Sequence, residues 1–262
     1  RKNKMAKKID YFNFKNCSAL IAGGATGLGY QMAKGLLSRG CKVIIISRNS
    51  DKINEAKNTL NNQFKSQCHG IVCDISDQKS ILYMKKRLLN ISKGKLNIAI
   101  NSAGFNIRNR IENVSLEEWE NIQKVNLTGG FLFAKNIFSY LKKADFGRLI
   151  NITSIFSKVS FPERISYSSS KGGLIQLTKT LALEWAEHNI TVNLISPGPF
   201  LTDINKPVLE NPENYKKFCL NIPKNRFGNP EEIITASLFL SSKYSSYVNG
   251  SDIVVDGGWL SS

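Results

Sequence analysis

The chain has 262 residues, of which 42% are hydrophobic, and a formal net charge of +16. This length supports one large domain with a substantial core, or two small ones, and no apolar run reaches the ~18 residues that a membrane span needs. The charge comes from dispersed lysines rather than from a basic helix or a basic-aromatic stripe, which argues against a specific nucleic-acid or membrane surface.

Histidine and cysteine usage limits the chemistry further. The two histidines, His69 and His188, lie far apart without ligand spacing, so no metal site is expected. The five cysteines are odd in number and form no Cys-x-x-Cys motif, which favours buried reduced thiols in a reducing compartment. No apolar segment of a signal peptide follows the basic residues 1–8. We expect a cytoplasmic protein with a basic tail at residues 1–13 and one domain at residues 14–262.

Short apolar runs alternate along the chain with longer helical patterns. The runs predict strands at 17–22, 42–47, 69–73, 96–102, 148–153, 191–196 and 253–255. The helical patterns lie at 28–38, 51–62, 77–90, 115–142, 167–188 and 231–241, and Ser115 and Glu118 form a capping box at the start of the fourth. This alternation predicts an α/β fold, with a parallel sheet covered by helices on both faces. The proline-rich stretch 197–230 is predicted to be an irregular substrate loop or lid.

A glycine-rich loop follows the first predicted strand. Gly23, Gly27 and Gly29 stand in the pattern Gly-x3-Gly-x-Gly, and the first helix begins there. Glycine permits a tight turn and a close approach of the backbone, and a helix N-terminus offers free N–H groups to a diphosphate. The loop therefore predicts a dinucleotide site.

The end of the second strand bears on the choice of dinucleotide. Ser47, Arg48 and Asn49 occupy the position where NAD-preferring folds carry an acid, and this chain has none. Ser47 leaves room for a 2′-phosphate, and the Arg48 guanidinium can pair with it as a fork. We expect NADP as the cofactor, with NAD as the alternative. At the end of the third strand, Asp74 either reaches the adenine or caps the next helix.

The catalytic prediction rests on Ser154, Tyr167 and Lys171. Tyr167 and Lys171 are four residues apart, so their side chains share one face of a helix that follows the strand ending at Ser154. A nearby ammonium favours the phenolate of a tyrosine, which can then exchange a proton with a substrate oxygen. Ser154 can hold the same oxygen. A second Tyr-x3-Lys match, Tyr11 and Lys15, precedes the first strand and is treated as chance.

With these motifs the chain resembles the short-chain dehydrogenase/reductase family over residues 14–260. Further matches to that family are Asn101-Ser102-Ala103-Gly104, Asn126, Pro197 to Thr202, and Asn249-Gly250 through Asp256-Gly257-Gly258. The resemblance implies a single-domain Rossmann fold, with a doubly wound seven-stranded parallel sheet in order 3-2-1-4-5-6-7, and a homotetramer or homodimer. It also implies that Lys171 binds the nicotinamide ribose and that Asn126 anchors a water. The expected catalytic residues are Ser154, Tyr167, Lys171 and Asn126. The expected cofactor site comprises Gly23, Thr26, Gly27, Leu28, Gly29, Ser47, Arg48, Asn49, Asp74, Ile75, Asn101, Ala103, Gly104, Tyr167, Lys171, Pro197, Gly198 and Thr202.

The substrate prediction is a sugar acid. Asn106-Ile107-Arg108 and the segment from Pro197 to Thr202 are similar to the gluconate 5-dehydrogenase-like group of that family. Arg108 and Arg164 are candidates to bind a substrate carboxylate, beside Ser154 and Phe200. A 3-oxoacyl thioester on an acyl carrier protein is the alternative substrate, and a non-catalytic NAD(P)-binding sensor is the alternative of another class. A serine hydrolase is excluded because no histidine stands near Ser154 and there is no Gly-x-Ser-x-Gly motif.

Overall fold

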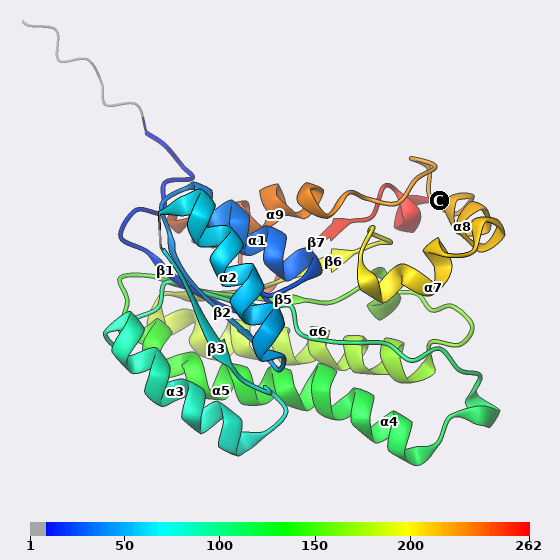
Figure 1. The fold of residues 1–262 in the computed structure, drawn as a ribbon, viewed down its shortest axis with the longest axis horizontal. Coiled ribbons are helices and arrows are strands. Elements are labelled where there is room, and N and C mark those ends of the chain that lie inside the picture. The colour runs from blue at the N-terminus through cyan, green and yellow to red at the C-terminus, as the bar shows by residue number, and fades with distance from the viewer. Residues whose placement is uncertain (1–8, 66) are drawn as a thin grey trace, which may run out of the picture.

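A seven-stranded parallel sheet forms the centre of the computed structural model, which describes residues 9–65 and 67–262 (Figure 1). The strand order is β3-β2-β1-β4-β5-β6-β7, which confirms the expected doubly wound arrangement. The strands are β1 (Ser18–Ala22), β2 (Lys42–Ser47), β3 (Cys68–Val72), β4 (Ile98–Asn101), β5 (Gly147–Ile152), β6 (Ile190–Pro197) and β7 (Asp252–Val255).

Helices cover both faces of this sheet (Figure 1). One face carries α1 (Gly27–Ser38), α2 (Ser50–Phe64) and α9 (Ile234–Ser241). The other face carries α3 (Gln78–Ser92), α5 (Gly129–Lys142) and α6 (Ile165–Trp185). The remaining α-helices of the described residues are α4 (Leu116–Gln123), α7 (Lys206–Leu209) and α8 (Pro212–Cys219).

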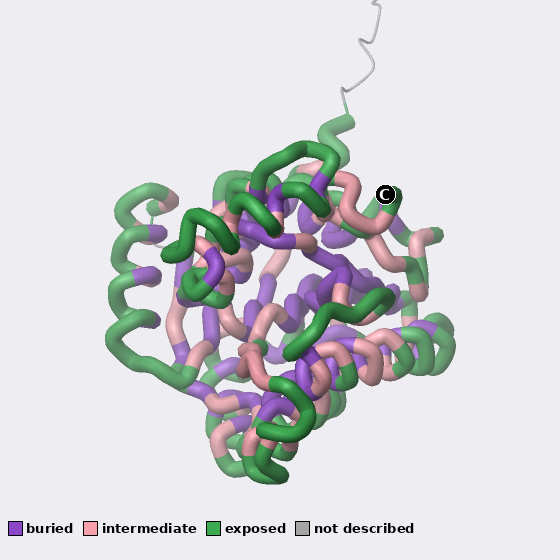
Figure 2. Tube along the Cα trace, turned by 90° about the vertical axis from the view of Figure 1, so that its right-hand side faces the viewer, coloured by how far each residue is buried: buried purple, intermediate pink, exposed green. Residues whose placement is uncertain are grey.

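Two hydrophobic cores result, one on each side of the sheet. Along β1, Leu20 belongs to one core and Ile21 to the other, and Ile44 and Ile45 of β2 divide in the same way. Successive side chains of a strand point to opposite faces, so a strand with helices on both sides must be apolar throughout. Figure 2 shows these buried segments at the centre, surrounded by exposed outer helix faces. Because the strands are buried on both faces, they form apolar runs that could be predicted from the sequence.

The helix predicted at 115–142 is not one regular α-helix. It comprises α4, a π-helical turn (Lys124–Thr128) and α5. The predicted start is confirmed, because the Ser115 hydroxyl accepts a hydrogen bond from the Glu118 amide at 3.1 Å in a complete capping box. The wide turn adds backbone between α4 and α5 and so sets the relative rotation of their two buried faces.

The segment 197–230 is more ordered than predicted, since it contains α7 and α8. Pro207 and Pro212 stand in the first turn of these helices, where proline has no amide bond to lose. Asn211 caps α8 by accepting a hydrogen bond from the Asn214 amide at 3.0 Å. A small separate core that includes Val208 and Phe227 holds the segment together. The stretch predicted to be irregular therefore contains two short helices, each with a proline in its first turn.

The expected basic cluster at residues 1–8 lies outside the described residues. The tail boundary at residue 14 stays a prediction, although Tyr11 already packs on Tyr244 with ring centroids 5.0 Å apart. The Ser242 hydroxyl also donates a hydrogen bond to the Tyr11 carbonyl at 2.7 Å. All five cysteines are free thiols. No helix among the described residues is both long and apolar enough to cross a membrane.

Candidate active site

A cavity of about 560 Å³ lies beyond the carboxyl ends of the central strands. Its walls come from the segments that follow β1 to β6, with Phe218 of α8 at one side. Ligands of doubly wound sheets bind at this edge, because the chain leaves the sheet there in loops of adaptable shape. The cavity therefore occupies the position where the sequence predicts a dinucleotide and its substrate.

The glycine loop has the geometry that close packing requires. Gly23 and Gly27 have φ values of +72° and +53°, which side chains other than glycine rarely adopt. At Gly29, an added Cβ would lie 2.2 Å from the Gly23 carbonyl oxygen, so a methyl group has no room between the loop and α1. Gly23, Thr26, Gly27 and Leu28 line the cavity at the start of α1, whereas Gly29 lies behind them and holds the helix close.

The end of β2 contributes positive charge to the cavity. Ser47 and Arg48 line it as expected, and so does Lys52 of α2, which the sequence analysis did not single out. Its spacing of four residues from Arg48 across the start of a helix was the available signal. Asn49 does not line the cavity, because its side chain caps α2 by accepting a hydrogen bond from the Lys52 amide at 2.9 Å.

The structure at the end of β3 excludes one of the two interpretations of Asp74, the capping of α3. Asp77, not Asp74, caps α3, because its carboxylate accepts a hydrogen bond from the Ser80 amide at 2.7 Å. The Asp74 carboxylate instead accepts hydrogen bonds from the Ser76 amide and hydroxyl, at 2.8 Å and 2.6 Å. Asp74 and Ile75 both line the cavity. The carboxylate is thus held in place by its own turn at the wall of the cavity, and its contact with an adenine stays a prediction.

Ser154 and Tyr167 come together at the other end of the cavity. The Tyr167 side chain is buried, and burial raises the pKa of its phenol because the charged form loses its hydration. Hydrogen bonding with Ser154 and the positive charge of Arg164 act in the opposite direction on this pKa. The phenol therefore stands among groups that can stabilise its ionised form.

Lys171 lies one helical turn after Tyr167 on the same face of α6. Its ammonium is 5.8 Å from the centroid of the Tyr167 ring and donates a hydrogen bond to the Ile152 carbonyl at 2.8 Å. The side chain is 4% exposed, and burial lowers its pKa to about 8. A Cβ added at Gly104 would lie 3.2 Å from this ammonium, so the glycine leaves Lys171 its space. The effect expected of Lys171 on the phenol pKa stays a prediction.

Asn126 and Asn101 lie one layer behind the wall of the cavity. The Asn126 amide donates hydrogen bonds to the Phe105 carbonyl and the Ser170 hydroxyl, both at 3.0 Å, and accepts one from the Phe105 amide. Asn101 is buried at the end of β4. The Asn126 side chain supports the backbone that carries the site, whereas Ala103, Gly104, Pro197, Gly198 and Thr202 line the cavity directly. The water-anchoring role expected of Asn126 stays a prediction.

Two arginines and several phenylalanines line the cavity. Arg108, Arg164 and Phe200 line the cavity as expected, together with Phe156 and Phe218. Arg164 is 4% exposed, and its guanidinium lies 6.0 Å from the centroid of the Phe156 ring. Burial lowers the pKa of Arg164 to about 10, and the charge of Arg108 acts in the same direction. Cationic and aromatic side chains therefore stand together in this part of the cavity.

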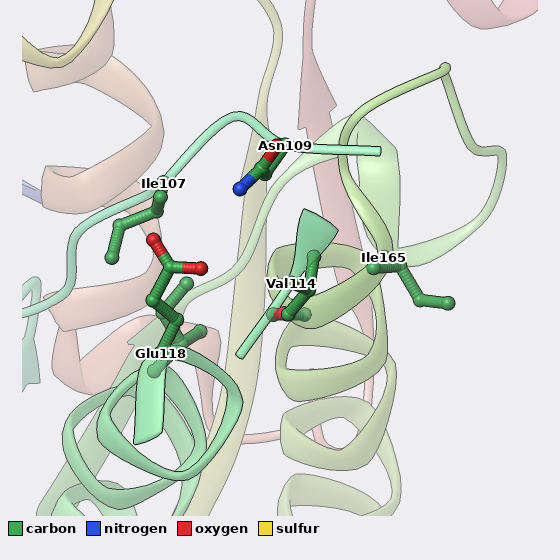
Figure 3. A pocket seen from close by; sticks show the side chains of 7 residues that line it. Ile107, Asn109, Val114, Glu118 and Ile165 are labelled. Atoms are coloured by element: carbon green, nitrogen blue, oxygen red, sulfur yellow. The ribbon is translucent and has the colours of Figure 1, made fainter. Parts of the chain in front are cut away.

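The loop that carries Arg108 borders a second, smaller crevice. Ile107 and Asn109 of this loop meet Val114, Glu118 of α4 and Ile165 of α6 there (Figure 3). Figure 3 shows Ile107 next to Glu118, whose carboxylate also completes the capping box of α4. Arg108, between Ile107 and Asn109, extends to the segment after β6, where it donates a hydrogen bond to the Ile204 carbonyl at 3.3 Å.

Comparison with known proteins agrees with this geometry. The family model described as enoyl-(acyl carrier protein) reductase matches residues 23–260. The 3-oxoacyl-(acyl-carrier-protein) reductase of Buchnera aphidicola is 38% identical over 92% of this chain and 96% of its own. The chain is a short-chain dehydrogenase/reductase.

Other proteins similar to this short-chain dehydrogenase/reductase are named as dehydrogenases of a sugar acid. The gluconate 5-dehydrogenase of Gluconobacter oxydans is 29% identical over 95% of this chain and 96% of its own. The crystal structure of a gluconate 5-dehydrogenase from Burkholderia cenocepacia, in complex with NADP and tartrate, has a TM-score of 0.90 and 29% identity. The match covers 97% of this chain and 98% of the Burkholderia cenocepacia chain.

Several cavity residues of this short-chain dehydrogenase/reductase were missed in the sequence. Asp203, Ile204, Asn205 and Pro207 come from the segment around α7, which the proline pattern marked only as a loop. Phe105 and Phe156 each follow a strand by a few residues, and nothing in their local pattern separates them from core aromatic residues. Their position at the ends of β4 and β5 was the signal that could have identified them.

Proposed function

We propose that this oxidoreductase transfers a hydride between NADP and the oxygen-bearing carbon of a small carboxylate substrate, with a sugar acid as the first candidate. The observation that carries the proposal is Arg164, a buried guanidinium beside Tyr167. Among the described residues, no carboxylate forms an ion pair with it. A buried charge is stable only when it is paired, and a substrate carboxylate supplies the partner.

The residues of the cavity fit a dinucleotide. The glycine loop brings free amide groups at the start of α1 to the wall, and Ser47, Arg48 and Lys52 stand where an adenosine 2′-phosphate would lie. When bound, the nicotinamide supplies or accepts the hydride. Tyr167 then donates a proton to the substrate oxygen in reduction and accepts it in oxidation, while Ser154 holds that oxygen. Lys171 binds the ribose beside them.

The preference for NADP is tested by replacing Arg48 with alanine. Loss of a charge-assisted pair to phosphate raises the Kd for NADPH by about 10- to 100-fold. The Kd for NADH changes by less than about twofold, because NADH has no 2′-phosphate for this arginine to bind. Nicotinamide fluorescence measures both constants, and Arg87→Ala, which changes an exposed arginine of α3 outside the cavity, serves as the control. Equal losses for the two cofactors would mean that Arg48 does not contact the 2′-phosphate.

The sugar-acid substrate is tested by a turnover comparison. With NADPH, we expect reduction of 5-keto-D-gluconate, measured against an uncharged hydroxyketone of similar size. In Arg164→Met, the ratio of kcat/KM for the acid to kcat/KM for the uncharged ketone falls by about 10- to 100-fold. A ratio that does not change would remove Arg164 from carboxylate recognition.

A 3-oxoacyl thioester is the second candidate substrate. The 38% identity to the Buchnera aphidicola reductase supports it, and so does the net charge of +16, which suits an acidic carrier protein. Turnover of acetoacetyl thioesters without turnover of any keto sugar acid would favour this candidate. Tight NADPH binding without turnover of either substrate would favour the sensor.

We also expect a homotetramer or homodimer in the cytoplasm. Leu116 of α4 and Phe131 of α5 are exposed apolar side chains, and their position on the outer helices supports a surface for a second copy. Light scattering after size-exclusion chromatography would give the mass, and a monomer at micromolar concentration would contradict the expectation.

A further inference from the structure

Arg164 stands at an unusual point of the chain. The preceding residue, Glu163, has a φ of +65°, a left-handed conformation that residues other than glycine rarely adopt. Glu163 itself is exposed, whereas Arg164 directly after it is buried at the start of α6. Such strain is retained where the surrounding structure requires it, often at a functional site. The turn at Glu163 therefore brings a cation into the cavity.

The guanidinium of Arg164 has unused capacity to bind. Among the described residues, its side chain donates one hydrogen bond, to the Glu163 carbonyl at 3.1 Å, although a guanidinium has five N–H donors. Its flat face lies over Phe156. Arg108 lies near enough that the two charges repel each other, which leaves both arginines better satisfied with an anion between them. A carboxylate on the substrate fits this position.

The same guanidinium acts on Tyr167. Burial raises the pKa of the phenol, and the charge of Arg164 lowers it, as does hydrogen bonding with Ser154. The other charged groups near the pair are Lys171 on α6, Arg108 on the loop after β4, Glu163 before α6, and Asp203 in the segment after β6. Of these, Asp203 lines the cavity but forms no ion pair with Arg164 in the described part of the chain.

We propose that Arg164 couples recognition of the substrate carboxylate to proton transfer, so that an anionic substrate keeps Tyr167 in its protonated, proton-donating form. This inference rests on the proposed carboxylate substrate. When Arg164 is free, its positive charge favours the phenolate. When a carboxylate binds it, the local charge is neutralised and the phenol holds its proton more strongly. Binding of a keto acid thus keeps Tyr167 protonated, and in reduction the proton passes from the Tyr167 oxygen to the substrate oxygen.

The test is a titration of Tyr167 that does not depend on turnover. The enzyme is labelled with carbon-13 at the tyrosine Cζ and saturated with NADP, and the Tyr167 signal is assigned by its loss in Y167F. We expect the titration midpoint in R164Q to lie about one pH unit above that of the wild type. R164K keeps the charge and stays near the wild type. R164M is the replacement for R164Q if the glutamine variant does not fold.

Ligand addition separates the two halves of the inference. Tartrate, a small dicarboxylate, raises the midpoint in the wild type and leaves it unmoved in R164Q, while uncharged erythritol moves neither. Coincident midpoints in the wild type and R164Q without ligand would overturn the coupling. A difference between them that tartrate does not alter would leave Arg164 acting on Tyr167, overturn its link to carboxylate recognition, and count against the proposed sugar acid.

Discussion

Replacing Tyr167 with phenylalanine lowers turnover by about 10³-fold or more, while NADPH still binds. The change removes one hydroxyl from a buried ring and leaves the shape of α6 intact, so the proton donor is lost without loss of the cavity. Ser154 cannot replace it, because an aliphatic hydroxyl ionises much less readily than a phenol. Steady-state kinetics gives the loss, and nicotinamide fluorescence gives the cofactor affinity.

The chain provides a matched control for this variant. Tyr11 and Lys15 have the same spacing as Tyr167 and Lys171, but Tyr11 packs on Tyr244, away from the cavity. Tyr11→Phe should leave both kcat and KM within about twofold of the wild type, as surface substitutions usually do. Normal activity in Tyr167→Phe, or an equal loss in both variants, would contradict the assignment of Tyr167 as the proton donor.

Lys171→Met should stabilise the protein without cofactor at pH 7 while it removes most of the activity. Burial lowers the pKa of Lys171 from 10.5 to about 8, so keeping the ammonium charged in the fold costs about 3 kcal/mol below pH 8. Methionine removes that cost but leaves the Ile152 carbonyl without its donor, which offsets about 1 kcal/mol. The expected net gain in the free energy of unfolding is about 1–2 kcal/mol.

The stability difference between the wild type and Lys171→Met should depend on pH. Because the folded-state pKa is depressed, the unfolded wild type binds more protons than the folded form between pH 8 and pH 10.5. The stability of the wild type therefore rises relative to the variant over that window, and the advantage of methionine disappears by pH 10.5. Urea unfolding at pH 7 and pH 10 measures both values. A variant less stable than the wild type at pH 7 would show that the ammonium is stabilised in the fold.

The sheet was predictable because burial on both faces leaves a strong signature. β2 consists of Lys42 followed by four buried aliphatic residues and Ser47, and its predicted and observed ends agree. The helix at 115–142 was harder, because hydrophobic spacing reports a helical period and does not reveal one wide turn. The segment 197–230 was hardest, since Pro207 and Pro212 serve as helix starts there. A proline in a loop and a proline in the first turn of a helix cannot be distinguished from the local sequence.

The candidate site divides in a similar way. The glycine loop and the pair Tyr167 and Lys171 were predicted from spacing within one segment, and Ser154 from its place directly after a predicted strand. The burial of Arg164 was not predictable from the sequence, because it depends on the turn at Glu163 and on Phe156 from another loop. Lys52 was missed for a simpler reason, since the charge of a surface helix does not show which side chains reach a cavity.

The π-helical turn between α4 and α5 makes chain length critical at one point. An α-helix turns by about 100° per residue, so deleting one residue from Lys124–Thr128 would restore a regular helix and rotate one half against the other. Ile122 of α4 and Phe133 of α5 are both buried now, and a regular helix would take one of them out of the core. Surface loops tolerate insertions and deletions, but a change in length between α4 and α5 would disrupt the core. The fold therefore constrains the number of residues in this segment.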